Sequence, residues 1–219
     1  MGIWEINAGE LILAGGPIMI PIILCSVVAV AIVIGKLLYL SSIKTDTHKL
    51  KTDVFDMVRN NQVKEAVRLC DENPSPVAKV IKAGVLKMGA DRETVREAME
   101  DMSLFEIPKL EKRFSALSTI ANVTPLLGLL GTVAGMTVSF HTIQVRATSM
   151  SPVTPGDLAG GIWEALLTTV AGLIVAIPTF VAYNYLVSRV NYIVLEMERA
   201  ATELLNFLCN FAETTEISQ

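Results

Sequence analysis

Hydrophobic residues fill three long stretches of the sequence, and charged residues gather between them. Residues 11–35 carry no charge, and residues 114–145 contain no acid, lysine or arginine. Residues 158–188 contain one formal charge, Glu164. A helix needs about 20 apolar residues to cross the hydrocarbon core of a bilayer, so each stretch is long enough to span a membrane. The pattern predicts an all-α membrane protein with three transmembrane helices.

The first stretch predicts a transmembrane helix over residues 11–40, after a short periplasmic segment, residues 1–10. A cleaved signal peptide would have basic residues ahead of a shorter apolar run. The segment here instead contains Glu5 and Glu10 and no Lys or Arg. Its two prolines lie near the start of the span, where their missing N–H groups cost least. We therefore expect this span to be retained.

The distribution of basic residues predicts the orientation. The chain has 18 Lys and Arg, of which none precedes Lys36 and 14 lie in residues 44–113. Arg189 and Arg199 follow the third stretch, and Arg146 alone lies between the second and third. Cytoplasmic loops carry an excess of Lys and Arg. The expected protein is a multi-pass membrane protein with its N-terminus outside the cell membrane and its C-terminus in the cytoplasm.

The two later stretches predict a helical hairpin. Residues 114–145 would form a helix of roughly 48 Å, longer than a bilayer core of about 30 Å, so its membrane part is placed at about 122–144. The polar, turn-rich connection, residues 146–157, is a periplasmic loop. A third span over residues 158–187 leads into a cytoplasmic C-terminal helix, residues 188–219.

Residues 41–113 predict a cytoplasmic helical segment that extends the membrane helices. Its amphipathic pattern favours one helix at about 47–72 and another at about 76–107, interrupted near Gly89. Pro108 is expected to break or bend the chain before the second span. The 13 acidic residues of the segment balance its basic residues, so we expect its charged side chains to face solvent.

Two polar residues of this segment are candidate helix caps. Ser75 is followed by Pro76, which is the usual order of an N-cap and the first helical residue. Asp91 follows the interruption and is expected to cap the restarted helix.

Composition narrows the function further. The net charge of −4 argues against nucleic acid as a partner. The three cysteines lie far apart, and the two histidines have no second ligand at helical spacing, so we expect no metal site and no disulfide. No nucleophile–base pair or phosphate-binding loop is present in the sequence, and we expect no enzyme.

Glu164 suggests an ion pathway. A charged carboxylate in lipid costs roughly 2.5–3.5 kcal/mol or more, so its side chain should face protein or water. Thr168 and Thr169 add hydroxyls in the same helix. Small residues recur at steps of three or four on one face, where a second helix can approach closely. They are Gly161, Ala165, Thr168, Gly172 and Ala176.

The second span offers the matching surface. Pro125 is expected to kink it and to free a carbonyl group. After it, Gly131 and Gly135 form a GxxxG motif with Gly128 nearby, and we expect these glycines to pack against a helix. Counting residues from the loop places Thr132 and Thr169 at nearly the same depth, roughly 16–18 Å inside the outer boundary.

The residues after Pro125, GLLGTVAGM, and those over 160–178, GGIWEALLTTVAGLIVAIP, with AYN at 182–184, resemble the ExbB/TolQ/MotA family of bacterial proton-channel subunits. Three spans and a large cytoplasmic segment resemble the ExbB/TolQ branch, because MotA-type stators have four spans. The motif is specific over roughly residues 121–186. Gly161-Ile162-Trp163 departs from the family's usual PGIAE sequence before the glutamate.

The resemblance implies a homopentamer around a central pore, which encloses the transmembrane helices of an ExbD/TolR-like dimer. That partner would supply an intramembrane aspartate, and a TonB/TolA-like protein would be a further partner. Proton flow would drive work at the cell envelope, such as TonB-dependent import. No cofactor is implied, and sodium in place of protons stays open. The candidate proton-pathway residues are Glu164, Thr132, Thr169 and Thr168; the packing residues are Gly128, Gly131, Gly135, Gly161, Ala165 and Gly172; the kink residues are Pro125 and Pro178.

Several alternatives stay open. A neutral Glu164 could fix assembly by a hydrogen bond to a neighbouring subunit without carrying protons. The protein could be a non-conducting scaffold that anchors envelope machinery. The same class of motor could serve Tol-Pal envelope maintenance or gliding motility.

Overall fold

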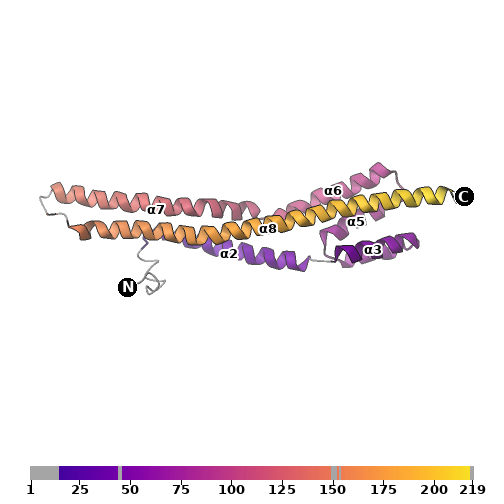
Figure 1. Ribbon diagram of the computed structural model, residues 1–219, viewed down its shortest axis with the longest axis horizontal. Coiled ribbons are helices and arrows are strands. Elements are labelled where there is room, and N and C mark those ends of the chain that lie inside the picture. Colours follow the sequence, from indigo (N-terminus) through magenta and orange to yellow (C-terminus); the bar gives the residue numbers. More distant parts are fainter. Residues whose placement is uncertain (1–14, 44–45, 149–151, 153, 218–219) are drawn as a thin grey trace. The chain divides into compact units, whose positions relative to one another are not determined.

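The computed structural model describes residues 15–43, 46–148, 152 and 154–217, and every regular element among them is a helix (Figure 1). The expected N-terminal segment 1–10 and the first four residues of the expected first span lie outside the described residues. Within these described residues, three helical stretches are long and apolar enough to cross a membrane. The all-α class and the three spans are therefore confirmed.

The helices divide into two compact units. Unit 1 comprises residues 1–35 and 113–184, and unit 2 comprises residues 36–112 and 185–219. Helices α2 (Met19–Ser42) and α8 (Pro155–Ile217) contribute to both units. In the apolar windows of the three membrane-length stretches, only 22%, 28% and 33% of residues are buried within the chain. Their outward surface is the part that lipid or other subunits would cover.

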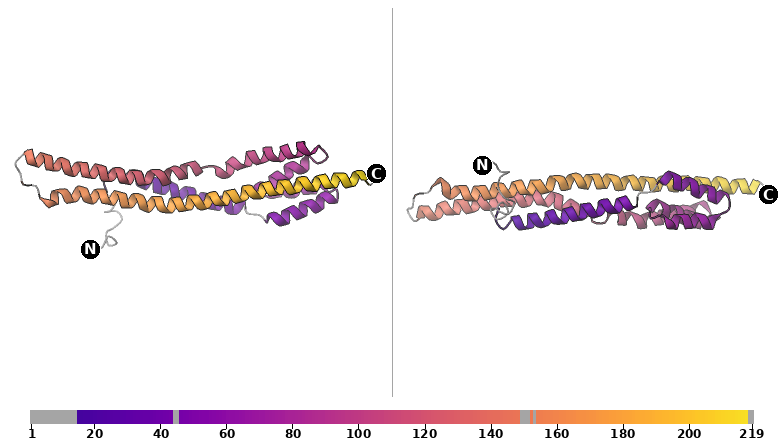
Figure 2. Two further views of the ribbon diagram at one scale, coloured as in Figure 1. Left: turned by 45° about the horizontal axis from the view of Figure 1, so that its top comes forward. Right: turned by 90° about the horizontal axis from the view of Figure 1, so that it is seen from below.

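Unit 1 holds helix α7 (Phe114–Thr148), which runs beside the amino-terminal part of α8 (Figures 1 and 2). The connection between them is shorter than expected, since α7 continues to Thr148 and α8 begins at Pro155. Helix α8 is continuous for 63 residues, so no break separates the expected third span from the expected C-terminal helix at residues 187–188. Pro178 lies inside this helix and removes one backbone hydrogen bond without ending it.

Unit 2 contains four short helices: α3 (Thr47–Arg59), α4 (Val63–Glu72), α5 (Pro76–Leu86) and α6 (Arg92–Glu111). The single helix expected over 47–72 is wrong, because the chain turns between α3 and α4. Asn61 adopts a left-handed conformation there, with φ +61°. Asparagine tolerates this region better than most residues, so the Asn60-Asn61 pair allows the turn.

The expected caps of α5 and α6 are confirmed. The Ser75 side chain accepts a hydrogen bond from the backbone N–H of Val77, and Pro76 occupies the first helical turn. The Asp91 carboxylate accepts one from the N–H of Thr94. Between the two helices, Gly89 has φ +93°, which explains the interruption expected at this residue.

Pro108 does not break the chain as expected. It lies inside α6, which continues to Glu111, and α7 begins at Phe114. The break occurs at Arg113, whose φ is +73°. The carbonyl of Leu110 in the last turn of α6 accepts a hydrogen bond of 2.6 Å from the buried Nζ of Lys36. This cation satisfies a helix-end carbonyl, which favours ending the helix there.

The core of unit 2 lies where the short helices pack against the carboxyl-terminal part of α8. Gly84 lies close to Met99 and Leu204, and the rings of Phe55 and Phe207 stack with their centroids 4.8 Å apart. Aliphatic side chains fill the interior, among them Val54, Val58, Val80, Ile81, Met99, Met197 and Leu204. Burial of this set supplies the main stabilisation of the segment outside the membrane.

Candidate functional site

Helices α7 and α8 approach so closely that their small residues touch backbone to backbone. A Cβ added at Gly135 would lie 2.6 Å from the carbonyl oxygen of Gly161. One added at Gly128 would lie 3.0 Å from the carbonyl oxygen of Thr168, and one at Gly172 would lie 2.9 Å from that of Thr124. Every glycine predicted to pack is therefore at the contact between these two helices, where larger side chains would force them apart.

Thr168 belongs to this contact. Its side chain is 1% exposed and lies against Gly131, and its hydroxyl donates to the carbonyl of Ala165. A side chain covered by its own chain does not line a pore. We correct the expectation for Thr168: it is a packing residue in this structure, as its place in the small-residue stripe also indicated.

Thr169 and Thr132 lie nearer the outside of the helix pair. The half-buried Thr169 hydroxyl donates to the carbonyl of Gly128 across the interface, at 3.0 Å. The Thr132 hydroxyl donates to the carbonyl of Leu129 in its own helix, at 2.7 Å. Because Thr169 is level with Gly128, it lies about one helical turn from Thr132, so the two are less well aligned in depth than expected.

Glu164 lies beside the turn that begins the first span. A Cβ added at Gly16 would overlap the Oε1 atom of Glu164 and lie 2.8 Å from its Cδ. Gly16 also has φ +65°, which L side chains rarely adopt. Helix α2 starts three residues after Gly16, at Met19, so the backbone N–H groups of its first turn lie close to Gly16 in the chain. The acid is therefore half-buried within one subunit.

Three further residues contribute to this site. Thr124 is fully buried next to Gly172, and its hydroxyl donates to the carbonyl of Ile120. Ser139 is 4% exposed and lies against Gly161. Both lie on the face of the GxxxG glycines, at spacings of three or four residues, so the helical periodicity that marks the packing face extends to them. Nothing in the sequence pointed to Gly16, which is far away in the chain.

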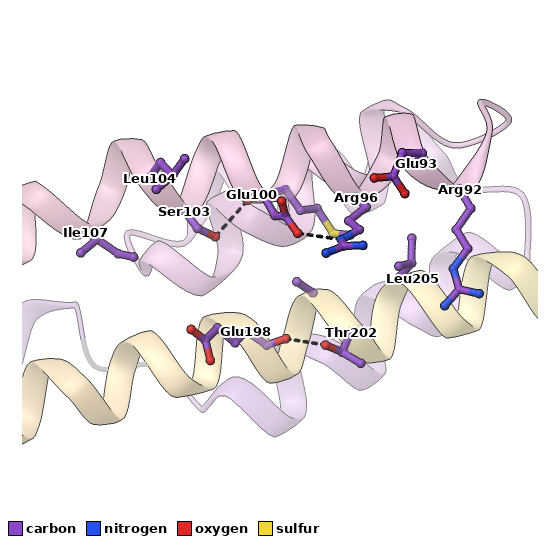
Figure 3. Close-up of a pocket in the computed structure, with 12 residues that line it drawn as sticks. Arg92, Glu93, Arg96, Glu100, Ser103, Leu104, Ile107, Glu198, Thr202 and Leu205 are labelled. Atoms are coloured by element: carbon purple, nitrogen blue, oxygen red, sulfur yellow. Dashed lines mark hydrogen bonds and ion pairs between the residues drawn. The ribbon is translucent and has the colours of Figure 1, made fainter.

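A groove in unit 2 lies between α6 and α8 and has a volume of about 680 Å³ (Figure 3). Arg96 pairs with Glu100 along its edge, and Glu198 and Thr202 project from α8. The hydroxyl of Ser103 donates to the carbonyl of Met99. Within the described residues, no group of three His, Cys, Asp or Glu side chains could hold a metal ion.

Three membrane-length helices, with a carboxylate and hydroxyls at a closely packed helix pair, are typical of a multi-pass membrane protein of the channel class. The sequence profile of the "MotA/TolQ/ExbB proton channel family" matches residues 72–199. The chain belongs to this family.

Individual relatives agree. The chain is 35% identical over 173 residues to the "Putative biopolymer transport protein ExbB-like 3" of Synechocystis sp., covering 78% of this chain and 81% of the relative. It is 31% identical over 191 residues to the "Biopolymer transport protein ExbB" of Salmonella typhimurium, covering 76% and 70%. It is 38% identical over 131 residues to the "Tol-Pal system protein TolQ" of Haemophilus influenzae, where it spans half of the relative's length and 59% of its own.

Proposed function

We propose that this protein is the membrane subunit of an ExbB/TolQ-like motor driven by the proton-motive force. It would form a homopentamer around the single-span helices of an ExbD/TolR-like dimer, in the inner membrane, with its N-terminus periplasmic. The observation that carries the proposal is the polar set formed by Glu164, Thr132 and Thr169, which lie half-buried along the closely packed pair of helices α7 and α8. Membership of a proton-channel family supports the same function.

In this proposal the two threonines and the acid have different roles. Thr169 and Thr132 supply hydroxyls that can turn from backbone carbonyls toward water or toward the partner's aspartate. Glu164 exchanges or relays a proton near the outer end of the path. Each proton that crosses releases about 2.3 kcal/mol per 100 mV, which the partner helices convert into motion at the envelope.

The test is proton flux in proteoliposomes that contain the purified protein and an ExbD/TolR-like single-span partner. Thr169→Ala and Glu164→Gln are expected to reduce flux about tenfold, because each removes a polar group whose hydrogen bond is worth about 1.4 kcal/mol, a factor of ten in rate. Thr179→Ala is the matched control, because this threonine also lies in α8 and its buried hydroxyl donates to the carbonyl of Val175 in the same helix. Unchanged flux in both path variants would refute the assignment.

Native mass measurement of the same variants separates this function from a structural role of Glu164. A proton-carrying acid leaves the oligomer intact when it is changed to Gln, whereas an acid that holds subunits together does not. A non-conducting scaffold predicts no flux in the wild type and no effect of dissipating the proton gradient on the partner system.

A further inference from the structure

A second polar pocket in unit 2 lies just beyond the ends of two membrane-length runs. It has a volume of about 380 Å³ and is lined by residues of α2, α3, α5 and α8 and of the α2–α3 connection. Its apolar wall includes Leu40 and Ile43, and its polar wall includes Arg189, Tyr192 and Glu196. Neither the proton path nor the contact between α7 and α8 uses these residues.

The pocket lies at the level of lipid headgroups. Arg189 comes two residues after residue 187, where the third span is expected to end, and Leu40 comes five residues after Gly35. At 1.5 Å per residue these positions are roughly 3 and 8 Å beyond the apolar runs. The headgroup layer is about 5–8 Å deep on each side of the hydrocarbon core. Tyr192 fits the same place, since tyrosine is enriched at this boundary.

The charges of the pocket suit a ligand with one anionic and one cationic group. The Arg189 guanidinium lies over the Tyr192 ring, 5.7 Å from its centroid, and within the described part of the chain it forms no ion pair. The Glu196 side chain is 17% exposed and has only a loose contact with Arg199, at 3.4 Å. Asp46 also lines the pocket, beside its role as the N-cap of α3.

We propose that this pocket binds the headgroup of a zwitterionic glycerophospholipid of the phosphatidylethanolamine type. The phosphate lies on Arg189, which offers a fork of N–H donors that suits phosphate oxygens. The ammonium group faces Glu196 and Asp46, and the first carbons of the acyl chains lie on Leu40 and Ile43. Among the described residues that line the pocket, two are acids and one is a base, which disfavours a purely anionic headgroup such as phosphatidylglycerol.

The experiment measures phospholipid that stays bound when the protein is released from nanodiscs of equal phosphatidylethanolamine and phosphatidylglycerol and stripped stepwise in native mass spectrometry. The wild type is expected to keep phosphatidylethanolamine longest. Arg189→Gln is expected to lower its retention at least about tenfold, and Arg189→Lys to lower it less. Arg68→Gln is the matched control, because Arg68 is exposed, pairs with Glu72 and is not among the residues that line the pocket, and this variant should retain as much lipid as the wild type.

Three outcomes would overturn the proposal: equal retention of the two lipids by the wild type, unchanged retention in Arg189→Gln, or displacement of the lipid by millimolar inorganic phosphate. The last would show a site for free phosphate. Glu196→Gln adds a readout that misfolding does not mimic, since it should shift the preference toward phosphatidylglycerol while total retention persists. The result does not depend on proton flux, so it stands or fails separately from the proposed motor.

Discussion

At the scale of single residues, two separate constraints meet at Gly16. Its backbone is left-handed, with φ +65°, and its missing side chain leaves the space that the Glu164 carboxylate fills. Either constraint alone favours glycine, because a Cβ costs about 1 kcal/mol in this backbone region and also meets the carboxylate. The residue therefore controls how closely the start of the first span approaches the candidate acid.

Gly16→Ala is expected to displace Glu164 or the first turn of α2, to lower the melting temperature by several degrees, and to reduce proton flux. The physical reason is the added cost of about 1–3 kcal/mol for a strained and overpacked position. Thermal stability by size-exclusion chromatography after heating, together with the flux assay, measures both effects. Gly35→Ala is the control, since a Cβ there meets nothing within 4 Å and alanine favours the helix. Equal stability of both variants would contradict the close contact.

Cys70 offers a chemical test of packing outside the membrane. Its side chain is 2% exposed, and burial, followed by the charge of Asp71, raises the pKa of the thiol to about 11. Because only the thiolate reacts, the native protein should resist alkylation at Cys70 at pH 7.5 and react after unfolding. Mass spectrometry of a Cys25→Ser, Cys209→Ser background detects the label. Glu65→Cys, at an exposed position of the same helix, should react within minutes; rapid labelling of native Cys70 would argue against the buried core.

At the scale of helices, the sequence predicted elements wherever a local signal was present. Periodicity and cap chemistry gave the starts of α5 and α6, and the small-residue spacing gave the face by which α7 and α8 pack. Prediction from the sequence failed where tertiary contacts determine the ends and the register of the helices. The turn at Asn61 interrupts a good amphipathic pattern, and α6 continues past Pro108 to end where Lys36 reaches the carbonyl of Leu110. The register of α8 on α7, and hence the burial of Thr168, also depends on partners that a single sequence does not reveal.

Gly131 tests the contact between α7 and α8. A Cβ there would overlap the Oγ1 atom of Thr168 and lie 2.6 Å from its Cβ. Gly131→Ala is expected to destabilise the protein by about 1–3 kcal/mol, because the helices must separate or shift. The melting temperature in detergent measures the change. Gly160→Ala, where a Cβ meets nothing within 4 Å, should be neutral or slightly stabilising. A loss at Gly160 equal to that at Gly131 would contradict the packing.

Glu106 joins α5 to α6 in unit 2. Its side chain is 3% exposed and forms ion pairs with Lys79, at 2.9 Å, and Lys109, at 2.5 Å. Burial alone would raise the pKa of the carboxyl, but the hydrogen bonds and charges of the two lysines outweigh it, so the pKa lies below its ordinary value. The ionised form therefore stabilises the folded state.

Glu106→Gln is expected to cost about 2 kcal/mol at neutral pH, in the range for hydrogen bonds to charged groups. A lowered pKa means that this stabilisation is complete above the ordinary carboxyl pKa and is lost as the pH falls through the lower folded-state pKa. The difference in melting temperature between wild type and variant should be constant from pH 8 to about 5 and shrink below the ordinary pKa of 4.5. A difference in melting temperature that stays the same down to pH 3 would show that the charge of Glu106 does not stabilise the folded state.

At the scale of the whole molecule, charge patterning predicted more than any single motif. Three membrane-length helices and membership of the family follow from the apolar runs and from the residues after Pro125. Helical extension beyond the membrane was also predictable, because the second apolar run is longer than the thickness of a bilayer core. Burial within one chain does not distinguish the faces of these helices that contact lipid from those that contact water, because most residues of the apolar windows are uncovered. That distinction depends on the membrane and on the other subunits.

The predicted orientation rests on the distribution of basic residues, because 17 of the 18 Lys and Arg lie on one side of the membrane that the three apolar runs would span. The positive-inside rule then places residue 152 in the periplasm and residue 64 in the cytoplasm. In a cysteine-free background, Pro152→Cys should react with a membrane-impermeant maleimide in spheroplasts, and Lys64→Cys only in inverted vesicles. Both positions are exposed, so each should react fully once detergent is added. The reverse labelling pattern would show that the protein has the opposite orientation. The Glu164 end of the proposed path would then lie on the cytoplasmic side, where a proton-driven motor has no source of incoming protons.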